Sequence, residues 1–198
     1  YLYYADRIYQ INLAVAGIAI GTVLLPSLSK YIKQKNLKKV KFIQNRSLEL
    51  SLFLSLPATL ALLISSEEIT SALFGYGSFD IKSVKNSALA LYFFSFGLPA
   101  FALIKVFSSY IFARHNTKTP FIFSIYSVII NISLSVYFFD DLGFIIIPIA
   151  TTISSWFNAL MLFIFIIKEK YFEFENSFIF SLFKIILNSM ITCFLFYQ

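Results

Sequence analysis

The chain has 198 residues, of which 59% are hydrophobic and 13% are charged, and its mean hydropathy is +0.79. A soluble domain of this size does not need so much apolar surface, so the composition excludes an ordinary soluble domain and favours an integral membrane protein. A single cysteine, Cys193, excludes an internal disulfide and a cysteine-based metal site. The formal net charge of +6 lies mainly in loops between apolar segments, which does not indicate a nucleic-acid-binding protein.

Long apolar segments follow one another along the chain. A helix needs about 20 apolar residues to span the bilayer core, and six segments qualify: 8–29, 47–65, 86–112, 121–139, 142–167 and 178–197. The sequence therefore predicts an all-α integral membrane bundle. Pro57, Pro99 and Pro148 lie inside spans, where each is expected to kink its helix. Because the chain begins in a polar turn and stops directly after an apolar run, we expect a fragment of a longer protein.

The charges of the loops predict an orientation. Loop 30–46 contains seven Lys or Arg residues and no acid, and loops 113–120 and 168–177 also carry Lys and Arg. Loop 66–85 carries two lysines, and the tight turn at 140–141 carries two aspartates. The positive-inside rule therefore places the first three loops in the cytoplasm and both ends of the chain outside.

The first apolar segment has a polar and small face. Arg7, Gln10, Ala14, Gly17 and Gly21 recur at steps of three and four residues, which puts them on one side of a helix. The two glycines form a G-x-x-x-G pair, which allows another helix to come close. The alternative is packing alone, with the arginine reaching the lipid headgroups.

The charges in or at the mouths of the spans are mostly positive. We expect three cations there, Arg7, Lys105 and Lys184, against one acid, Asp6. This imbalance favours an anionic ligand, and the planar fork of an arginine suits phosphate oxygens. Asp6 and Gln10 are predicted to accompany Arg7 in the binding site. For the two lysines, an equally good interpretation is that they extend to the membrane surface.

Catalytic motifs are missing from the sequence. It contains no H-E-x-x-H, no G-x-S-x-G, no phosphate-binding Walker loop and no pair of intramembrane acids. His115, the only histidine, lies in the basic segment "ARHNTKTP". We therefore expect a protein that is not an enzyme and needs no organic cofactor.

Three stretches resemble the MurJ (MviN) family of lipid II flippases. They are "YYADRIYQINLAVAGIAIGTVLLPSLSK", "LFGYGSFD" and "ALALYFFSFGLPAFALIKVFSSYIFARHNTKTP", in the family's order and spacing. After Pro120 the resemblance is mostly one of hydropathy. It implies a fourteen-helix protein of the MOP-exporter (MATE-like) fold, with two six-helix lobes around a central cavity and a final helix pair that forms a groove for the lipid tail. This chain would supply the second lobe and the first groove helix.

The resemblance also implies a function. The family moves lipid II, a lipid-linked peptidoglycan precursor, across the bacterial cytoplasmic (inner) membrane by alternating access. Arg7, in "ADR", matches a cavity arginine that holds the diphosphate and head of lipid II. The implied partners are lipid II, membrane lipids and cell-wall synthesis proteins, without nucleic acid.

Energy coupling is implied less directly. Sodium ions or the membrane potential would supply it, and in some members sodium lies between the seventh, eleventh and twelfth helices. Asn131 and Thr151 fall at two ligand positions, but Ser135 stands where the family has an acid.

Other functions stay open at this point. One is another MOP exporter, such as a polysaccharide-lipid flippase or a drug exporter. A second is a membrane scaffold without transport, in which Arg7 would be dispensable. A third is a membrane enzyme that acts on lipid phosphates, for which these residues supply no acid, base or metal cluster.

Overall fold

The computed structural model describes residues 1–14, 17, 19–77 and 79–197, and within them every regular element is a helix, as the sequence predicts. The elements in chain order are α1 (Leu2–Leu13), α2 (Ala19–Lys33), α3 (Leu37–Ile64), α4 (Ser66–Phe74), α5 (Ile81–Ser95), α6 (Leu98–Phe112), α7 (Lys118–Tyr137), α8 (Phe139–Leu142), the 3-10 turn η2 (Gly143–Ile145), α9 (Ile146–Lys168) and α10 (Asn176–Tyr197).

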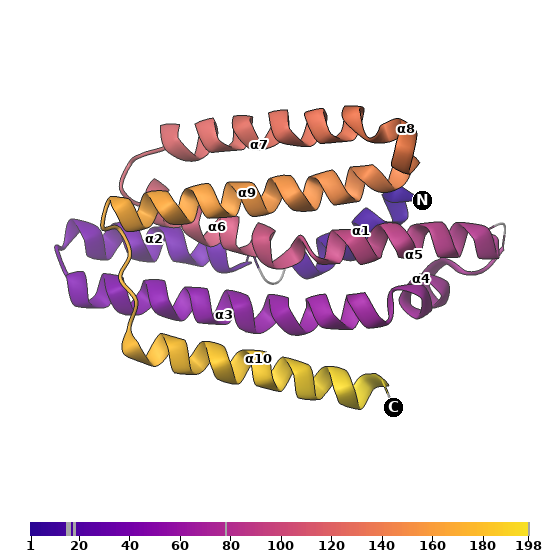
Figure 1. Cartoon of the computed structure of the whole chain (residues 1–198). Helices are drawn as coiled ribbons and strands as arrows, with labels where there is room; N and C mark the ends of the chain where they lie inside the picture. Colours follow the sequence, from indigo (N-terminus) through magenta and orange to yellow (C-terminus); the bar gives the residue numbers. More distant parts are fainter. Residues whose placement is uncertain (15–16, 18, 78, 198) are drawn as a thin grey trace.

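The long helices lie side by side in a bundle. From the top of Figure 1 to the bottom, α7 packs on α9, α9 on α6, α6 on α3, and α3 on α10. Both ends of the chain lie at the same end of the bundle (Figure 1). We call this the outer end and the opposite end, where α2 turns into α3, the inner end. The names follow the predicted orientation, which stays a prediction.

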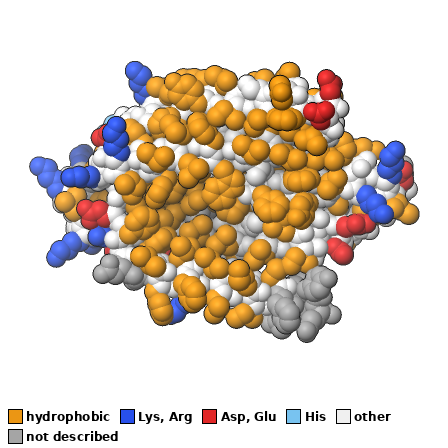
Figure 2. Space-filling model, viewed as in Figure 1, with side chains coloured by type: hydrophobic (Ala, Val, Ile, Leu, Met, Phe, Trp, Pro, Cys, Tyr) orange, Lys and Arg blue, Asp and Glu red, His pale blue; other side chains and the backbone are white. Residues whose placement is uncertain are grey.

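Two apolar clusters hold the bundle together. One lies toward the inner end, around the fully buried Leu28, Tyr110 and Ile166. The other lies toward the outer end, where α1 packs on α5, and it includes the fully buried Ala5 and Leu91. Figure 2 shows hydrophobic side chains over the middle of the visible face, most of the visible Lys and Arg at the inner end, and charged side chains of both signs at the outer end. Such an apolar band between charged ends is the surface that a bilayer requires.

Helix length bears on the predicted spans. Among the described residues, three helical stretches are long and apolar enough to cross a membrane, Leu37–Ile64, Lys118–Tyr137 and Phe139–Lys168, and α5 with α6 makes a fourth if the bent pair is one span. The first predicted span, 8–29, includes residues 15, 16 and 18, which lie outside the described residues. In the last predicted span, 178–197, the apolar helix is Phe178–Cys193, which is shorter than the three spanning helices. The number of six spans stays a prediction.

The predicted kink at Pro99 is confirmed, whereas α3 and α9 each continue as one helix through Pro57 and Pro148. The third span breaks between α5 and α6, which meet at 41°. Two side chains of α9 bind carbonyls at the break: Thr152 Oγ1 donates to Phe93 O at 2.8 Å, and Trp156 Nε1 donates to Phe96 O at 2.9 Å. A neighbouring helix therefore satisfies the backbone groups that the break releases, as an apolar environment demands.

The glycines of the first segment lie against α6, as predicted. A Cβ at Gly17 would lie 3.4 Å from Ala102 Cα and 3.4 Å from Lys105 Cγ, and one at Gly21 would lie 3.6 Å from Ser109 Oγ. The absence of side chains at these two positions lets the start of α2 and the residue Gly17 before it approach the backbone of α6. Gly17 makes the tighter contact, because its neighbours on α6 are closer and one of them is a backbone atom, which cannot move aside as a side chain can.

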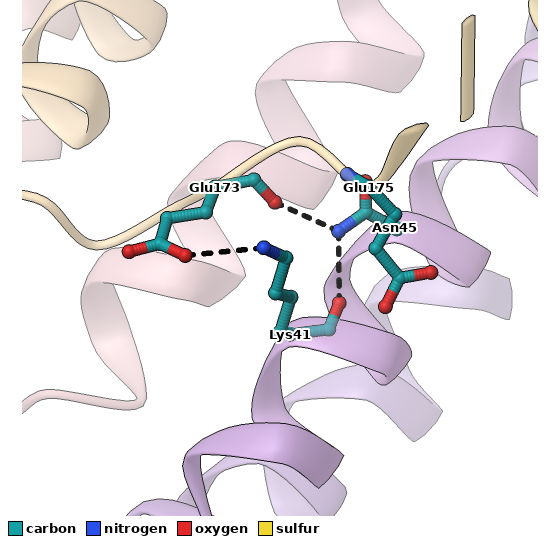
Figure 3. A network of polar contacts seen from close by, with 4 residues as sticks. All are labelled: Lys41, Asn45, Glu173 and Glu175. Carbon is teal, nitrogen blue, oxygen red and sulfur yellow. Dashed lines mark hydrogen bonds and ion pairs between the residues drawn. The ribbon is translucent and has the colours of Figure 1, made fainter. Parts of the chain in front are cut away.

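Polar side chains of α3 bind the connecting segment 169–175, which joins α9 to α10. Asn45 Nδ2 donates to Glu173 O at 2.9 Å, and Asn45 Oδ1 accepts from Glu175 N at 3.0 Å. Lys41 Nζ lies 3.1 Å from Glu173 Oε2 (Figure 3). Gln44 Nε2 donates to Tyr171 O at 2.9 Å. These bonds fix the start of α10 against the start of α3.

Candidate functional site

Asp6, Arg7 and Gln10 form one cluster on α1, close to the outer end. Arg7 Nη1 donates to Gln10 Oε1 at 3.3 Å, Gln10 Nε2 donates to Asp6 Oδ2, and the guanidinium carbon lies 4.9 Å from the centre of the Tyr3 ring. Arg7 and Gln10 are exposed and Asp6 is half-buried. Among the described residues Arg7 makes no ion pair, since Gln10 lies between the two charges. The guanidinium thus keeps several of its five N–H donors for a ligand.

Lys105 lies in a groove between α2, α6 and α7. The groove has a volume of about 750 Å³ and is lined by Gly17 and Gly21 on one side and by hydroxyl side chains, including Ser108 and Ser124, on the other. The stem of Lys105 fills the space that Gly17 leaves free. Its ammonium group is therefore carried on a packed stem at the edge of a groove lined by hydroxyls, where it can attract an anion.

Lys184 lies elsewhere. It lines a groove of about 430 Å³ between α3 and α10 together with Arg46, Glu49 and Asn188, and its ammonium lies 4.3 Å from the centre of the Phe180 ring. Among the described residues no contact joins Lys184 to Lys105 or to the Arg7 cluster. The structure therefore brings Asp6, Arg7 and Gln10 together and leaves the two lysines in separate grooves.

Glu49 corrects the expectation that Asp6 is the only acid in the spans. It lies within the predicted span 47–65, its side chain is 10% exposed, and it pairs with Arg46, whose side chain is 71% exposed. The signal for this pair was present in the sequence, because an acid three residues after an arginine on a helix faces it. The second groove therefore carries a buried carboxylate as well as cations.

Asn131 and Thr151 meet between α7 and α9. Asn131 Nδ2 donates to Thr151 Oγ1 at 3.1 Å and to Ser154 Oγ at 3.3 Å, and Thr151 Oγ1 donates to Ile147 O at 2.7 Å. A hard cation prefers several oxygen ligands, often carboxylates. Here the amide donates to the two hydroxyls, so the pair makes an interhelical hydrogen bond. Sodium binding at this pair stays a prediction.

The rest of the described chain offers no clustered metal ligands. Within residues 1–14, 17, 19–77 and 79–197, no group of three or more His, Cys, Asp or Glu side chains could hold a metal ion. His115 is exposed in the loop after α6. What the described site offers is therefore positive charge and hydrogen-bond donors on exposed helix faces.

Comparison with known proteins places these features in a family. The family model "Lipid II flippase MurJ" matches residues 1–198. A probable lipid II flippase MurJ from Rhizobium meliloti (strain 1021) is 47% identical over 162 residues, which are 82% of this chain and 30% of that protein. A probable lipid II flippase MurJ from Rickettsia prowazekii (strain Madrid E) is 38% identical over 168 residues, 85% of this chain and 33% of that protein.

A solved structure agrees with these sequence matches. It is described as lipid II flippase MurJ in an inward closed conformation, and it matches with a TM-score of 0.85 and 29% identity over 100% of this chain and 40% of that one. The chain spans about a third of the length of the curated relatives it matches. The chain therefore belongs to the MurJ family of lipid II flippases.

Proposed function

We propose that this chain is part of a flippase that moves lipid II across the bacterial cytoplasmic membrane for cell-wall synthesis, and that Arg7 holds the phosphate groups of that substrate. The role of Arg7 is inferred from its guanidinium, which is accessible to a ligand. It is exposed, it has one neutral hydrogen-bond partner in the described chain, and it carries no ion pair there.

Phosphate recognition suits this arrangement chemically. A guanidinium presents parallel N–H donors that match two oxygens of one phosphate, and a charge-assisted bond is about twice as strong as a neutral one. Gln10 holds the guanidinium by one bond of 3.3 Å, which is long and therefore easily replaced by a better acceptor. Asp6 binds Gln10 and stays available to hold the amide when the arginine turns to a ligand.

Lys105 is a second cation that could attract the substrate, nearer the inner end than Arg7. Its groove opens beside Gly17 and Gly21, between α2, α6 and α7. In alternating access the cavity opens first to one side of the membrane and then to the other. We assign Lys105 to an attraction that acts nearer the inner end and Arg7 to the contact nearer the outer end. Both ends of the chain would lie outside the cell.

Binding of lipid II by the complete protein tests the role of Arg7. Wild type, Arg7→Lys and Arg7→Ala are compared for lipid II and for undecaprenol, which has a similar tail but no phosphates. Hydrogen bonds to charged groups contribute roughly 1.5–3 kcal/mol, so Arg7→Ala should weaken lipid II binding about ten-fold or more. Arg7→Lys keeps the charge without the fork and should fall between the two.

Undecaprenol binding should not change in either variant, because it offers no phosphate. The control is Lys118→Ala, which removes an exposed cation from the start of α7. If Arg7→Ala inserts normally and binds lipid II as tightly as wild type, Arg7 does not hold the phosphates. A scaffold without transport would then account better for the chain.

A further inference from the structure

The inner end carries a pocket that is separate from the Arg7 cluster and from the Lys105 groove. It has a volume of about 330 Å³ and lies between the first turn of α3, the loop after α6 and the segment 169–175. Its charged lining residues are Lys38, Lys41, Arg114, Lys170 and Glu173. Four cations thus share a small volume with one carboxylate.

Arg114 is the fixed centre of this pocket. Its Nη1 donates to Tyr110 O at 2.7 Å, its Nη2 donates to Tyr171 O at 2.8 Å, and its guanidinium carbon lies 4.4 Å from the centre of the Tyr171 ring. The side chain is half-buried, and burial lowers the pKa of the guanidinium from its usual range. Arginine stays charged in proteins even so. Among the described residues no carboxylate pairs with it.

The one lining carboxylate is already engaged. Glu173 Oε2 lies 3.1 Å from Lys41 Nζ, as Figure 3 shows. Glu169 and Glu175 belong to the same connection but do not line the pocket. Lys38, Arg114 and Lys170 therefore contribute positive charge that no lining acid offsets. The first turn of α3 adds the positive end of its helix dipole.

The position of the pocket indicates where its ligand comes from. It lies where α3 begins and just beyond the end of α9, which is the level at which a spanning helix leaves the hydrocarbon core. Leu37, which also lines the pocket, is 76% exposed. Basic pockets at this level of the cytoplasmic side are suited to the headgroups of anionic lipids.

We propose that this pocket binds a phosphate group, with Arg114 as the fixed donor and Lys38 and Lys170 as the mobile cations. An anionic phospholipid of the inner leaflet would supply the phosphate from the membrane, and a soluble phosphate compound would supply it from the cytoplasm. The site is independent of the substrate contact assigned to Arg7, which lies on another helix near the other end of the bundle.

Binding to the complete protein in detergent tests the proposal. The probes are dioctanoyl phosphatidylglycerol, dioctanoyl phosphatidylcholine and inorganic phosphate, and the readout is the thermal unfolding midpoint as a function of probe concentration. Arg114→Gln is unsuitable alone, because it also removes two bonds to the backbone. The test variant is therefore Lys38→Gln with Lys170→Gln, since both side chains are exposed.

The matched control is Lys33→Gln with Lys118→Gln. These lysines are exposed at the same end and do not line the pocket, so the control has the same change in net charge. Loss of one hydrogen bond to a charged group corresponds to about ten-fold or more in affinity. We therefore expect phosphatidylglycerol to bind the test variant at least about ten-fold more weakly than wild type and the control about as tightly as wild type.

The arms of the experiment also separate the two sources. Phosphatidylglycerol binding that inorganic phosphate does not compete supports a lipid ligand, and competition by inorganic phosphate with the same loss in the test variant supports a soluble one. If the test and control variants lose the same affinity for phosphatidylglycerol, the effect is one of net charge and the proposal is wrong. The proposal is also wrong if neither phosphatidylglycerol nor inorganic phosphate binds to wild type. The loss caused by Lys38→Gln with Lys170→Gln should be the same in an Arg7→Ala background, which distinguishes this site from the proposed function.

Discussion

Arg7 and Arg114 carry the same side chain and are held in opposite ways. Arg114 donates two bonds of 2.7 and 2.8 Å to backbone carbonyls and stacks on Tyr171. Arg7 donates one bond of 3.3 Å to a side-chain amide and is exposed. The first guanidinium joins the loop after α6 to the segment before α10. The second has little to hold it in the described chain and is free to meet a ligand.

The comparison separates two uses of a charge in a membrane bundle. A half-buried arginine that is bound to carbonyls and not paired with a carboxylate is held in one position, so it places a positive charge at a fixed point. An exposed arginine beside a neutral partner costs the fold little when it moves. Substitution of Arg114 should therefore lower the free energy of unfolding, and substitution of Arg7 should lower the affinity for the ligand.

The first prediction tests whether the two arginines lie toward opposite sides of the membrane. In a Cys193→Ser background, Tyr76→Cys is expected to react fully with an impermeant thiol reagent in intact cells, and Gln34→Cys is expected not to react. Both positions are exposed, and they lie at opposite ends of the bundle. The opposite labelling would reverse the orientation derived from the loop charges.

The second prediction concerns stability. Arg114→Ala removes two charge-assisted bonds, and we expect it to lower the free energy of unfolding in detergent micelles by about 3 kcal/mol. Arg7→Ala should lower it by less than about 1 kcal/mol, because an exposed cation over a ring contributes little. Chemical unfolding of both variants beside wild type measures the difference. Equal losses would remove the distinction between the two arginines.

The third prediction concerns the helix pair between the two regions. Gly17→Leu should destabilise the protein by about 1–3 kcal/mol, because its Cβ alone would meet Ala102 Cα at 3.4 Å. Gly21→Ala is the milder partner variant, since its Cβ would meet Ser109 Oγ at an ordinary 3.6 Å, and it should change stability by less than about 1 kcal/mol. Tolerance of leucine at Gly17 in a thermal unfolding assay would show that α2 does not need this contact.

The smallest expected loss of stability is at the uncharged pair of Asn131 and Thr151, which serves as a comparison for the two arginines. Asn131→Ala removes hydrogen bonds to Thr151 and Ser154, and interhelical bonds in membranes average about 0.6 kcal/mol each. We expect a loss of about 1 kcal/mol and the same unfolding midpoint in sodium and potassium chloride. If sodium, but not potassium, raises the unfolding midpoint of wild type and Asn131→Ala abolishes this increase, the pair does bind sodium.

The sequence predicted the features that depend on local pattern. The period of apolar residues indicated the helices, Pro99 predicted the kink, and Gly17 with Gly21 predicted a close helix contact that the structure confirms. Each of these follows from residues that are neighbours on one helix. Glu49 lies within the predicted span 47–65 and pairs with Arg46 three residues before it, so it was missed although its signal is equally local.

Long-range partners could not be predicted in this way. Arg114 was interpreted as one of several loop cations, because its acceptor Tyr171 O lies 57 residues away in the sequence. The bond from Asn45 to Glu173 has the same character, because the partners are 128 positions apart in the sequence. Lys105 and Lys184 were grouped with Arg7 only because all three are cations in or at the mouths of predicted spans. The packing of α10 on α3 places Lys184 in a groove of its own.

The rate at which the complete protein moves lipid II between leaflets tests the central claim most directly. Proteoliposomes with equal amounts of wild type, Arg7→Lys, Arg7→Ala and Lys118→Ala protein are compared for the appearance of lipid II in the opposite leaflet. Loss of one charged contact to phosphate corresponds to about ten-fold or more, so we expect Arg7→Ala to be at least that much slower, Arg7→Lys to be intermediate and Lys118→Ala to match wild type. Translocation by Arg7→Ala at the wild-type rate would contradict the assignment of Arg7 to the substrate.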